Sequence, residues 1–388
     1  MRITILHRPP HDLFTMRLFY RLMQDVKTPA DAIYLWTMYF DKNLDHLSDI
    51  NNEVACKREM YTAIKNDLVI MGIKDHYTSG WYNPYTEDKP NLIQYFEDMF
   101  AFYRDKTFIV FTSTEGQTFN SPNVHVINWG GDLTNQRFEY QKLDPVIDKN
   151  LESKFSYISL NRNYRHHRTL ALSAVYGLNL EETGFITFMT RNEMPPVISD
   201  MACSIDEPML SILEKGFNKL KSATFAREDD YEIYPKLDNN NVHNFDNNLR
   251  NYYRDTFVEI ITETSFTETC YLLTEKTLNS IYGCNFPILL SGQGAVGFLR
   301  SMGLDMFDDV IDHSYDQIAD PVQRLYFAIE RNKEILNNSS LAKTLWLTNQ
   351  DRFLKNVEFA RNNLYNFYQT RAEKQWKELK HLYANISK

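Results

Sequence analysis

The sequence predicts an α/β protein in which two Rossmann-like domains face each other across a cleft, followed by C-terminal helices. Short apolar runs alternate with segments of helical periodicity in both halves of the chain. The apolar runs are continuous rather than alternating with polar residues, as is typical of parallel strands buried on both faces of a sheet. The length of 388 residues fits two to three domains at ~150 residues each.

In the first half, a β-type run opens the chain and is followed by helical patterning, then by strands and helices in alternation. We predict strands over residues 1–6, 67–73, 107–112 and 124–129. We predict helices over residues 14–23, 30–40 and 92–103. A polar stretch over residues 141–153 then favours a linker between domains.

A second alternation begins after this linker. We predict strands over residues 155–160, 185–189, 257–262 and 287–290, and helices over 166–178, 271–282 and 295–302. The segment from 191 to about 247 contains an Asn-rich run and predicts irregular structure. One or two helices with an apolar face are expected over residues 352–388. These elements give domains at 1–148 and 149–345 and a helical tail at 346–388.

Composition limits the function classes. The net charge is −9 and the isoelectric point is near 5.6, which argues against a surface that coats nucleic acid or an anionic membrane. The four cysteines form no C-x-x-C pair, which suits reduced thiols better than a disulfide framework or a zinc site. No stretch approaches the ~20 apolar residues of a membrane span. We therefore expect a soluble protein of the cytoplasm, or of the host cytoplasm if the protein is viral.

The first candidate site is a polar turn between a predicted strand and a predicted helix. Its members are Asn161, Arg162, Arg165, His166, His167 and Arg168. Strand ends face the ligand crevice in doubly wound sheets, and the helix N-terminus adds free N–H groups and partial positive charge. Guanidinium groups match phosphate oxygens, so the turn favours a phosphate site. The alternative is a solvated basic turn that pairs with acidic neighbours.

The second candidate site begins with Thr274, Glu275 and Lys276, early in a predicted helix. A carboxylate there can accept hydrogen bonds from a ribose diol, and the lysine beside it can reach a diphosphate. A glycine loop containing Gly292 follows the next strand and allows the backbone to approach a ligand closely. Three residues alone are a weak motif, and a helix that starts with Glu and a solvated Lys is the alternative.

The stretch YLLTEKTLNSIYGCNFPILLSG resembles the nucleotide-binding motif of the fucosyltransferase family and related glycosyltransferases with the two-Rossmann GT-B architecture. The longer block through FLRSMGLDMFDDVIDHSYDQIADPVQR, together with SLNRNYRHHR, is similar to the C-terminal domain of phage and bacterial glycosyltransferases. The resemblance covers roughly residues 155–330. It implies that the first domain is on the acceptor side and the second binds a nucleotide-sugar donor.

The resemblance also implies roles for single residues. Glu275 binds the ribose and Lys276 the diphosphate, while Arg162 and Arg168 neutralise charge on the leaving group. Glu263 supports either the sugar hydroxyls or the loop, and the donor site further includes Asn161, Thr274 and Gly292. The E-x7-E spacing of many retaining enzymes is absent, since Glu268 and Glu275 lie seven positions apart. We therefore expect an inverting transfer.

No resident cofactor or metal is expected. The carboxylates of the segment after residue 304 favour a solvated acidic loop with a helix cap. They are Asp305, Asp308, Asp309 and Asp312. In the motif IDHSYD, Asp312, Tyr315 and Asp316 have no individually assigned role. An inverting transfer needs a general base near the acceptor hydroxyl. The loops that follow strands of the first domain offer Asp132 and Glu115 as the leading candidates, then Asp12.

The predicted function is transfer of a sugar from a nucleotide-sugar to a hydroxyl acceptor. The acceptor is either a surface glycan or hydroxymethylated pyrimidine in phage DNA. The tail from 352 to 388 carries eight Lys or Arg against three Asp or Glu, which suits DNA contacts. The alternative is a non-catalytic nucleotide- or glycan-binding protein of the same fold. A dehydrogenase is disfavoured because no G-x-G-x-x-G follows the first strand.

Overall fold

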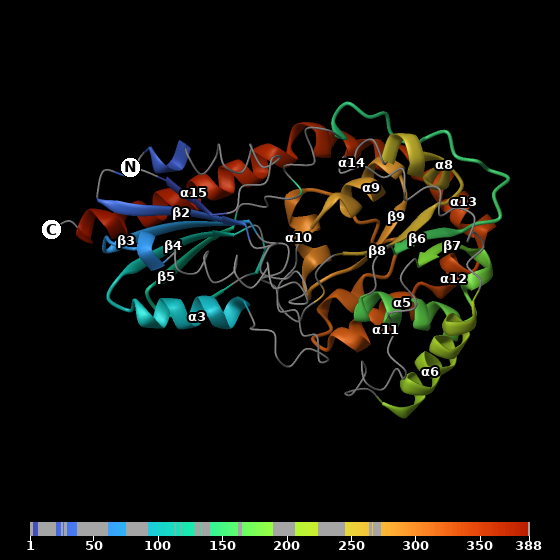
Figure 1. Ribbon diagram of the computed structural model, residues 1–388. Coiled ribbons are helices and arrows are strands. Elements are labelled where there is room, and N and C mark those ends of the chain that lie inside the picture. The colour runs from blue at the N-terminus through green and yellow to red at the C-terminus, as the bar shows by residue number, and fades with distance from the viewer. Residues whose placement is uncertain are drawn as a thin grey trace. The chain divides into compact units, whose positions relative to one another are not determined.

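The computed structural model describes residues 3–6, 21–24, 26, 29–36, 61–74, 92–112, 114–116, 118–128, 133, 140–161, 165–188, 206–223, 245–263, 266 and 273–386 (Figure 1). The chain divides into two compact units. Unit 1 comprises Met1–Asn135 and Tyr365–Lys388 with Cys270–Leu272, and unit 2 comprises Gln136–Thr269 and Leu273–Leu364. Each unit contains a parallel sheet and helices, so the predicted α/β class is confirmed.

The described part of unit 1 contains a five-stranded parallel sheet in the order β1-β2-β3-β4-β5. The strands are β1 (Ile3–Leu6), β2 (Ala30–Trp36), β3 (Leu68–Lys74), β4 (Thr107–Thr112) and β5 (Val124–Asn128). The helix that we predicted over residues 30–40 is therefore wrong. β2 pairs with β1 and β3, and its consecutive residues Ala32 and Ile33 are both buried. A short run buried on both faces lacks alternation, so its periodicity does not separate strand from helix.

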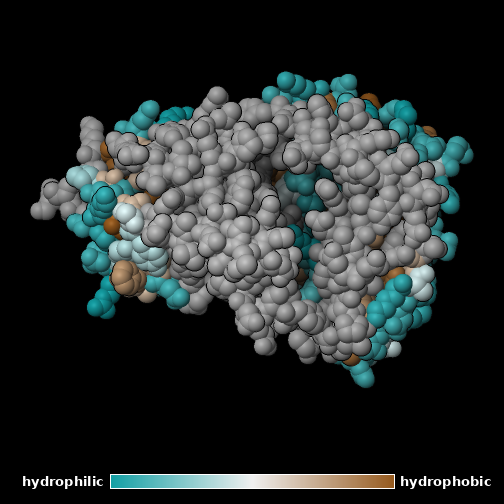
Figure 2. All heavy atoms as spheres, viewed as in Figure 1, coloured by the Kyte–Doolittle hydropathy of each residue, from teal (hydrophilic) through white to brown (hydrophobic). Residues whose placement is uncertain are grey.

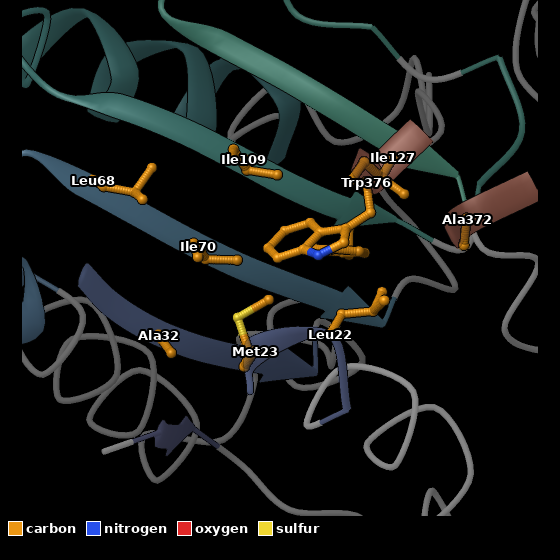
Figure 3. Packing of buried hydrophobic residues seen from close by; sticks show 10 residues of the cluster. Leu22, Met23, Ala32, Leu68, Ile70, Ile109, Ile127, Ala372 and Trp376 are labelled. Carbon is orange, nitrogen blue, oxygen red and sulfur yellow. The ribbon is translucent and has the colours of Figure 1, made fainter. Parts of the chain in front are cut away.

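The sheet of unit 1 is covered on both faces. Successive side chains of a strand point to opposite sides, so each strand contributes to both packed faces. Leu68 and Ile70 of β3 pack with Ala372 and Trp376 of α15 (Leu364–Ile386) on one face, as Figure 3 shows. On the other face, Val69, Met71 and Ile73 pack with α3 (Leu92–Phe102). The helix predicted over 92–103 is confirmed. The helix predicted over 14–23 is described only at residues 21–23.

The last helices are shared between the units rather than forming a segment of their own. α14 (Gln350–Asn362) lies in unit 2, whereas α15 from Tyr365 onwards belongs to unit 1. The predicted helices of the tail are thus present. Of the apolar face expected for them, Leu364, Tyr368 and Trp376 are buried, but Leu354 is exposed.

The described sheet of unit 2 has four parallel strands in the order β7-β6-β8-β9. They are β6 (Tyr157–Asn161), β7 (Gly184–Phe188), β8 (Val258–Thr262) and β9 (Phe286–Leu290), close to the predicted bounds. The chain moves from β6 outward to β7 and then returns to the other side of β6 at β8. The strand order therefore reverses between β6 and β8. In open α/β sheets, ligands bind outside the carboxyl ends of the strands at such a switch point.

Helices lie between and after the strands of unit 2 in the chain. They are α5 (His166–Gly177), α6 (Glu207–Ser222), α8 (Arg250–Arg254), α9 (Glu275–Gly283), α10 (Ala295–Met302), α11 (Pro321–Glu330), α12 (Lys333–Leu336) and α13 (Ser339–Thr348), with short turns at Glu181–Thr183 (η2), Phe245–Leu249 (η6) and Ser314–Gln317 (η7). The predicted irregular segment from 191 to 247 is wrong where α6 lies. Asp206 caps this helix, Pro208 stands in its first turn, and Met209, Leu213 and Phe217 form its buried stripe.

The polar stretch 141–153 is described as part of unit 2, which corrects the predicted linker. Val146 and Lys149 are buried there. The Val146 amide donates to Tyr282 O at 2.8 Å, and Lys149 Nζ donates to Tyr253 O and to Gly283 O at the end of α9, both at 2.6 Å. Burial lowers the pKa of Lys149 to about 7. The buried amino group of Lys149 fixes the segment on the unit through backbone carbonyls.

The crossing of α5 and α6 depends on two glycines. A Cβ at Gly216 would lie 1.8 Å from Ser173 O and 2.5 Å from Gly177 N. Both atoms are backbone, so the helices would have to separate. We expect Gly216→Ala to reduce the free energy of unfolding of unit 2 by about 3 kcal/mol, measured by urea denaturation. Gly297→Ala is the matched control, because its Cβ would meet Asp316 Oδ2 at an ordinary 3.7 Å. Equal stability of the two variants would contradict the close crossing.

The described surface over α6 is mainly hydrophilic, as Figure 2 shows. Among the described residues, no helix has both the length and the apolar character needed to cross a membrane.

Candidate functional site

The carboxyl edge of the unit 2 sheet gathers residues from separate stretches of the chain. β6 ends at Asn161, Glu263 follows β8, and Ser291 and Gly292 follow β9. Because the strands are parallel, these ends share one edge of the sheet. The helices α5, α9 and α10 also begin on this side. Each is the next helix after a strand, and the chain leaves a strand at its carboxyl end.

Asn161 is fully buried and its amide is bound within the protein. Its Oδ1 accepts from Thr262 Oγ1 at 2.9 Å, and its Nδ2 donates to Ser159 Oγ at 3.0 Å. Its backbone amide donates to Thr187 Oγ1 at 3.0 Å. Asn161, which we predicted in the donor site, therefore joins the ends of β6, β7 and β8 through its own hydrogen bonds.

His167 connects the start of α5 with the loop after β8. Its Nε2 lies 2.9 Å from Glu263 O, and its ring stacks on Phe266 with centroids 5.4 Å apart. Burial, followed by the charges of Arg168 and Arg165, lowers the pKa of His167 well below its ordinary value. The ring is thus neutral at neutral pH and can donate its Nε2 proton to the carbonyl oxygen.

Glu263 is fully buried and fixes the start of α9. Its Oε1 accepts from Thr274 N at 3.0 Å and from Thr277 Oγ1 at 2.7 Å, and its Oε2 accepts from Thr274 Oγ1 at 2.6 Å. A carboxylate is favourable at the positive end of a helix. Of the two roles that we predicted for Glu263, these contacts match support of the loop.

Glu275 and Lys276 lie in the first turn of α9 and are partly exposed, with 27% and 21% of their side chains accessible. Lys276 Nζ lies 3.1 Å from Glu275 Oε1 and 3.1 Å from Thr274 Oγ1. Thr274 is the N-cap residue of α9, and its side chain accepts from Lys276 N. The predicted Glu-Lys pair is therefore at the surface, and the lysine can exchange these contacts for an anion.

The glycine loop leads into a helix start that is already capped. Gly294 adopts the left-handed conformation with φ of 85°, and α10 begins at the next residue. The Val296 and Gly297 amides donate to the Asp316 carboxylate at 3.2 and 3.0 Å. Asp316, which the sequence left without a role, therefore caps α10. Gly292 remains beside this capped start.

The start of α5 differs from those of α9 and α10. Its N-cap residue is Arg165, whose side chain makes no cap hydrogen bond, and its first turn holds no acidic residue. Arg168 is buried in the same turn. The N-terminus of a helix attracts anions, and guanidinium groups strengthen this preference. Of the three helix starts, that of α5 is the best suited to a phosphate. Arg162, which we predicted here, lies outside the described residues.

Arg324 of α11 was missed by the sequence analysis. It is 1% exposed, donates from its guanidinium to Ile318 O at 2.7 Å and to Ser291 O at 3.3 Å, and lies 5.0 Å from the Phe266 ring centroid. It therefore holds the end of β9 and the loop after β8 together. No local pattern marks it, because an arginine on an amphipathic helix predicts a solvated position.

The acidic segment after residue 304 is held by arginines. Arg352 binds Asp305 and Asp309, and Arg300 binds Asp308. Asp312 accepts from Ser314 N at 2.8 Å. Tyr315 is buried and its hydroxyl accepts from Leu289 N. Within the part of the chain that the structure describes, no group of three or more His, Cys, Asp or Glu could hold a metal ion.

In unit 1, Glu115 follows β4 and is 2% exposed. Its Oε2 lies 2.7 Å from Arg371 Nη1 of α15, and its Oε1 is buried without a hydrogen-bond partner among the described residues. Burial raises the pKa of Glu115, and Arg371 partly offsets the effect. The other predicted bases, Asp132 and Asp12, lie outside the described residues.

No protein-family model, curated protein or solved structure matches this chain. The geometry of the described residues therefore has to support any assignment of function by itself.

Proposed function

We propose that this protein is a glycosyltransferase that moves a sugar from a nucleotide-sugar donor to a hydroxyl acceptor with inversion and without a metal. One observation carries the proposal. At the switch point of unit 2, the first turn of α5 holds no acidic residue and carries Arg165 and Arg168, whereas Glu263 and Asp316 accept hydrogen bonds at the starts of α9 and α10. A diphosphate is favoured on the amides of the first of these, because carboxylates already take amides of the other two. The facing GT-B arrangement of the two domains is part of the proposal.

Each donor residue then has a chemical task. The diphosphate binds the amides at the start of α5, with Arg168 and Arg162 neutralising its charge. Lys276 turns from Glu275 to a phosphate oxygen, and Glu275 is released to accept hydrogen bonds from the ribose hydroxyls. Asn161, Glu263, His167 and Arg324 set the positions of these elements, because their polar atoms contact other protein groups.

The transfer itself needs a base and a stabilised leaving group. The acceptor hydroxyl gives its proton to Glu115 Oε1 while its oxygen forms a bond to the anomeric carbon. The bond from that carbon to the diphosphate oxygen breaks, and its electron pair leaves with the nucleoside diphosphate. A carboxylate whose pKa is raised by burial is the stronger base. Since Oε1 is buried, the acceptor reaches it only when neighbouring groups separate on binding.

We place a glycan before modified DNA as the acceptor. Three of the cations in the basic tail contact other protein groups: Arg352 binds Asp305, Arg361 donates to Leu143 O and Arg371 binds Glu115. Fewer cations of the tail are then available for phosphates of a duplex. Modified DNA remains the second acceptor to test.

The experiment is an incubation of the full chain with a panel of UDP-, GDP-, CMP- and dTDP-sugars, followed by measurement of released nucleotide. We expect slow release from one donor class without acceptor, and faster release when oligosaccharides or hydroxymethylated DNA are added. Binding of a nucleotide without release from any donor, with or without acceptor, would contradict catalysis and favour the non-catalytic alternative.

A further inference from the structure

The polar edge of the unit 1 sheet is completed by the C-terminal helix. Arg371 and Gln375 stand four residues apart on α15, so they share one side of the helix. Arg371 binds Glu115 after β4, and Gln375 Oε1 accepts from Asn128 N at the end of β5 at 3.3 Å. Asn128 Nδ2 in turn donates to Thr114 O at 2.6 Å. Two side chains of α15 thus reach the carboxyl ends of neighbouring strands.

The apolar residues of α15 fix the position of the helix along the sheet, and this position decides where the polar contacts form. Ala372 and Trp376 belong to the core cluster on the same face of the sheet. In Figure 3, Trp376 lies over the strands and Ala372 lies nearer to their arrowheads. The helix therefore advances toward the carboxyl edge as it is followed toward its N-terminus, which brings Arg371 to Glu115.

The contact with Arg371 also gives the two carboxylate oxygens of Glu115 different surroundings. Oε2 is engaged by the guanidinium, whereas Oε1 is buried with no hydrogen-bond partner in the described part of the chain. A neutral amide, Asn128, is the polar group that β5 contributes nearby, so among the described residues the charge that acts on Glu115 is that of Arg371 on α15. An anchored oxygen and an uncommitted one are what a positioned base requires.

We propose that Arg371 is the positioning residue of the acceptor side: it holds Glu115 by Oε2 so that Oε1 takes the acceptor proton. This inference rests on the proposed function. A helix from the far end of the chain would thereby complete the reactive site of the first domain. Loss of the guanidinium removes a cation beside a buried carboxylate, which makes Glu115 harder to ionise.

The test is the pH dependence of the transfer rate at saturating donor for Arg371→Gln, Arg371→Lys and the control Glu373→Gln. Glu373 lies on the same helix and pairs with Arg21 at the surface. We expect Arg371→Gln to move the acid limb of the profile upward by about one pH unit and to lower the plateau about 10- to 100-fold. Arg371→Lys should recover part of both effects, and Glu373→Gln should match the natural chain.

A structural role alone would lower the plateau of Arg371→Gln and leave the acid limb where it is, which would overturn the inference. A carboxyl titration by ¹³C NMR with labelled glutamate decides the same point without turnover, with Glu115→Gln identifying the signal. The Glu115 midpoint should rise in Arg371→Gln, and an unchanged midpoint would also overturn the inference. If the natural chain releases no nucleotide from any donor, the proposed function fails, while this titration still reports whether Arg371 controls Glu115.

Discussion

Glu115→Gln is expected to bind nucleotide as tightly as the natural chain and to transfer sugar 10²- to 10⁴-fold more slowly. The amide keeps the size of the side chain and its contact with Arg371 but cannot accept the acceptor proton. General bases contribute about this factor to enzymatic rates. Calorimetry with the nucleoside diphosphate measures the first quantity, and initial rates at saturating donor measure the second.

Glu97→Gln is the matched control for this experiment. Glu97 is another carboxylate of unit 1, and it accepts from Ser121 Oγ at 2.8 Å. Its loss should change stability without selectively lowering the rate of folded protein. Full transfer activity in Glu115→Gln would exclude Glu115 as the base and direct the search to Asp132.

Lys276→Met is expected to weaken binding of the nucleoside diphosphate by about 10- to 100-fold. Hydrogen bonds to charged groups contribute about 1.5–3 kcal/mol, and each 1.4 kcal/mol is tenfold in affinity. The protein itself should remain folded, because Lys276 is partly exposed and its contacts with Glu275 and Thr274 are local to the start of α9. Calorimetric titration gives the affinity directly.

Two further variants make the Lys276 result specific. Lys276→Arg keeps the charge and should retain most of the affinity. Lys333→Met removes an exposed lysine of the same unit that pairs with Glu330, and it should bind like the natural chain. If Lys276→Met also binds normally, the lysine does not contact the diphosphate.

Much of the fold follows from local sequence. The run over residues 107–112 is apolar throughout, and β4 has the predicted bounds because a strand buried on both faces needs that composition. α10 ends at Gly303 as predicted, where φ is 107°. By contrast, β2 resembles a buried helix in its pattern, and its identity is decided by pairing with β1 and β3.

The missed helix α6 carried usable signals. Asp206, Glu207 and Pro208 form a typical helix start, and Met209, Leu213 and Phe217 recur at intervals of four. The neighbouring Asn-rich run led the prediction toward irregular structure over the whole segment. The capped start and the apolar stripe favour a helix, whereas the Asn-rich composition of the longer segment favours irregular structure.

The candidate sites also contain both residues that the sequence predicts and residues that it does not. Residues that follow strands, such as Asn161, Glu115 and Glu263, could be named from the sequence because strand ends share an edge of a parallel sheet. Arg324 and Arg371 could not, since each comes from a helix far along the chain and reaches the edge only after tertiary packing. The role of each predicted residue also depends on its tertiary contacts. Asn161 and Glu263, for example, make their hydrogen bonds to protein groups.

The central claim is that a diphosphate binds unit 2 at the start of α5, within reach of Lys276. A crystal structure of the full chain with the nucleoside diphosphate chosen by the donor panel tests it most directly. We expect phosphate oxygens on the amides of the first turn of α5 and on Lys276 Nζ. A nucleotide bound at the amino edge of that sheet, or on unit 1, would contradict it.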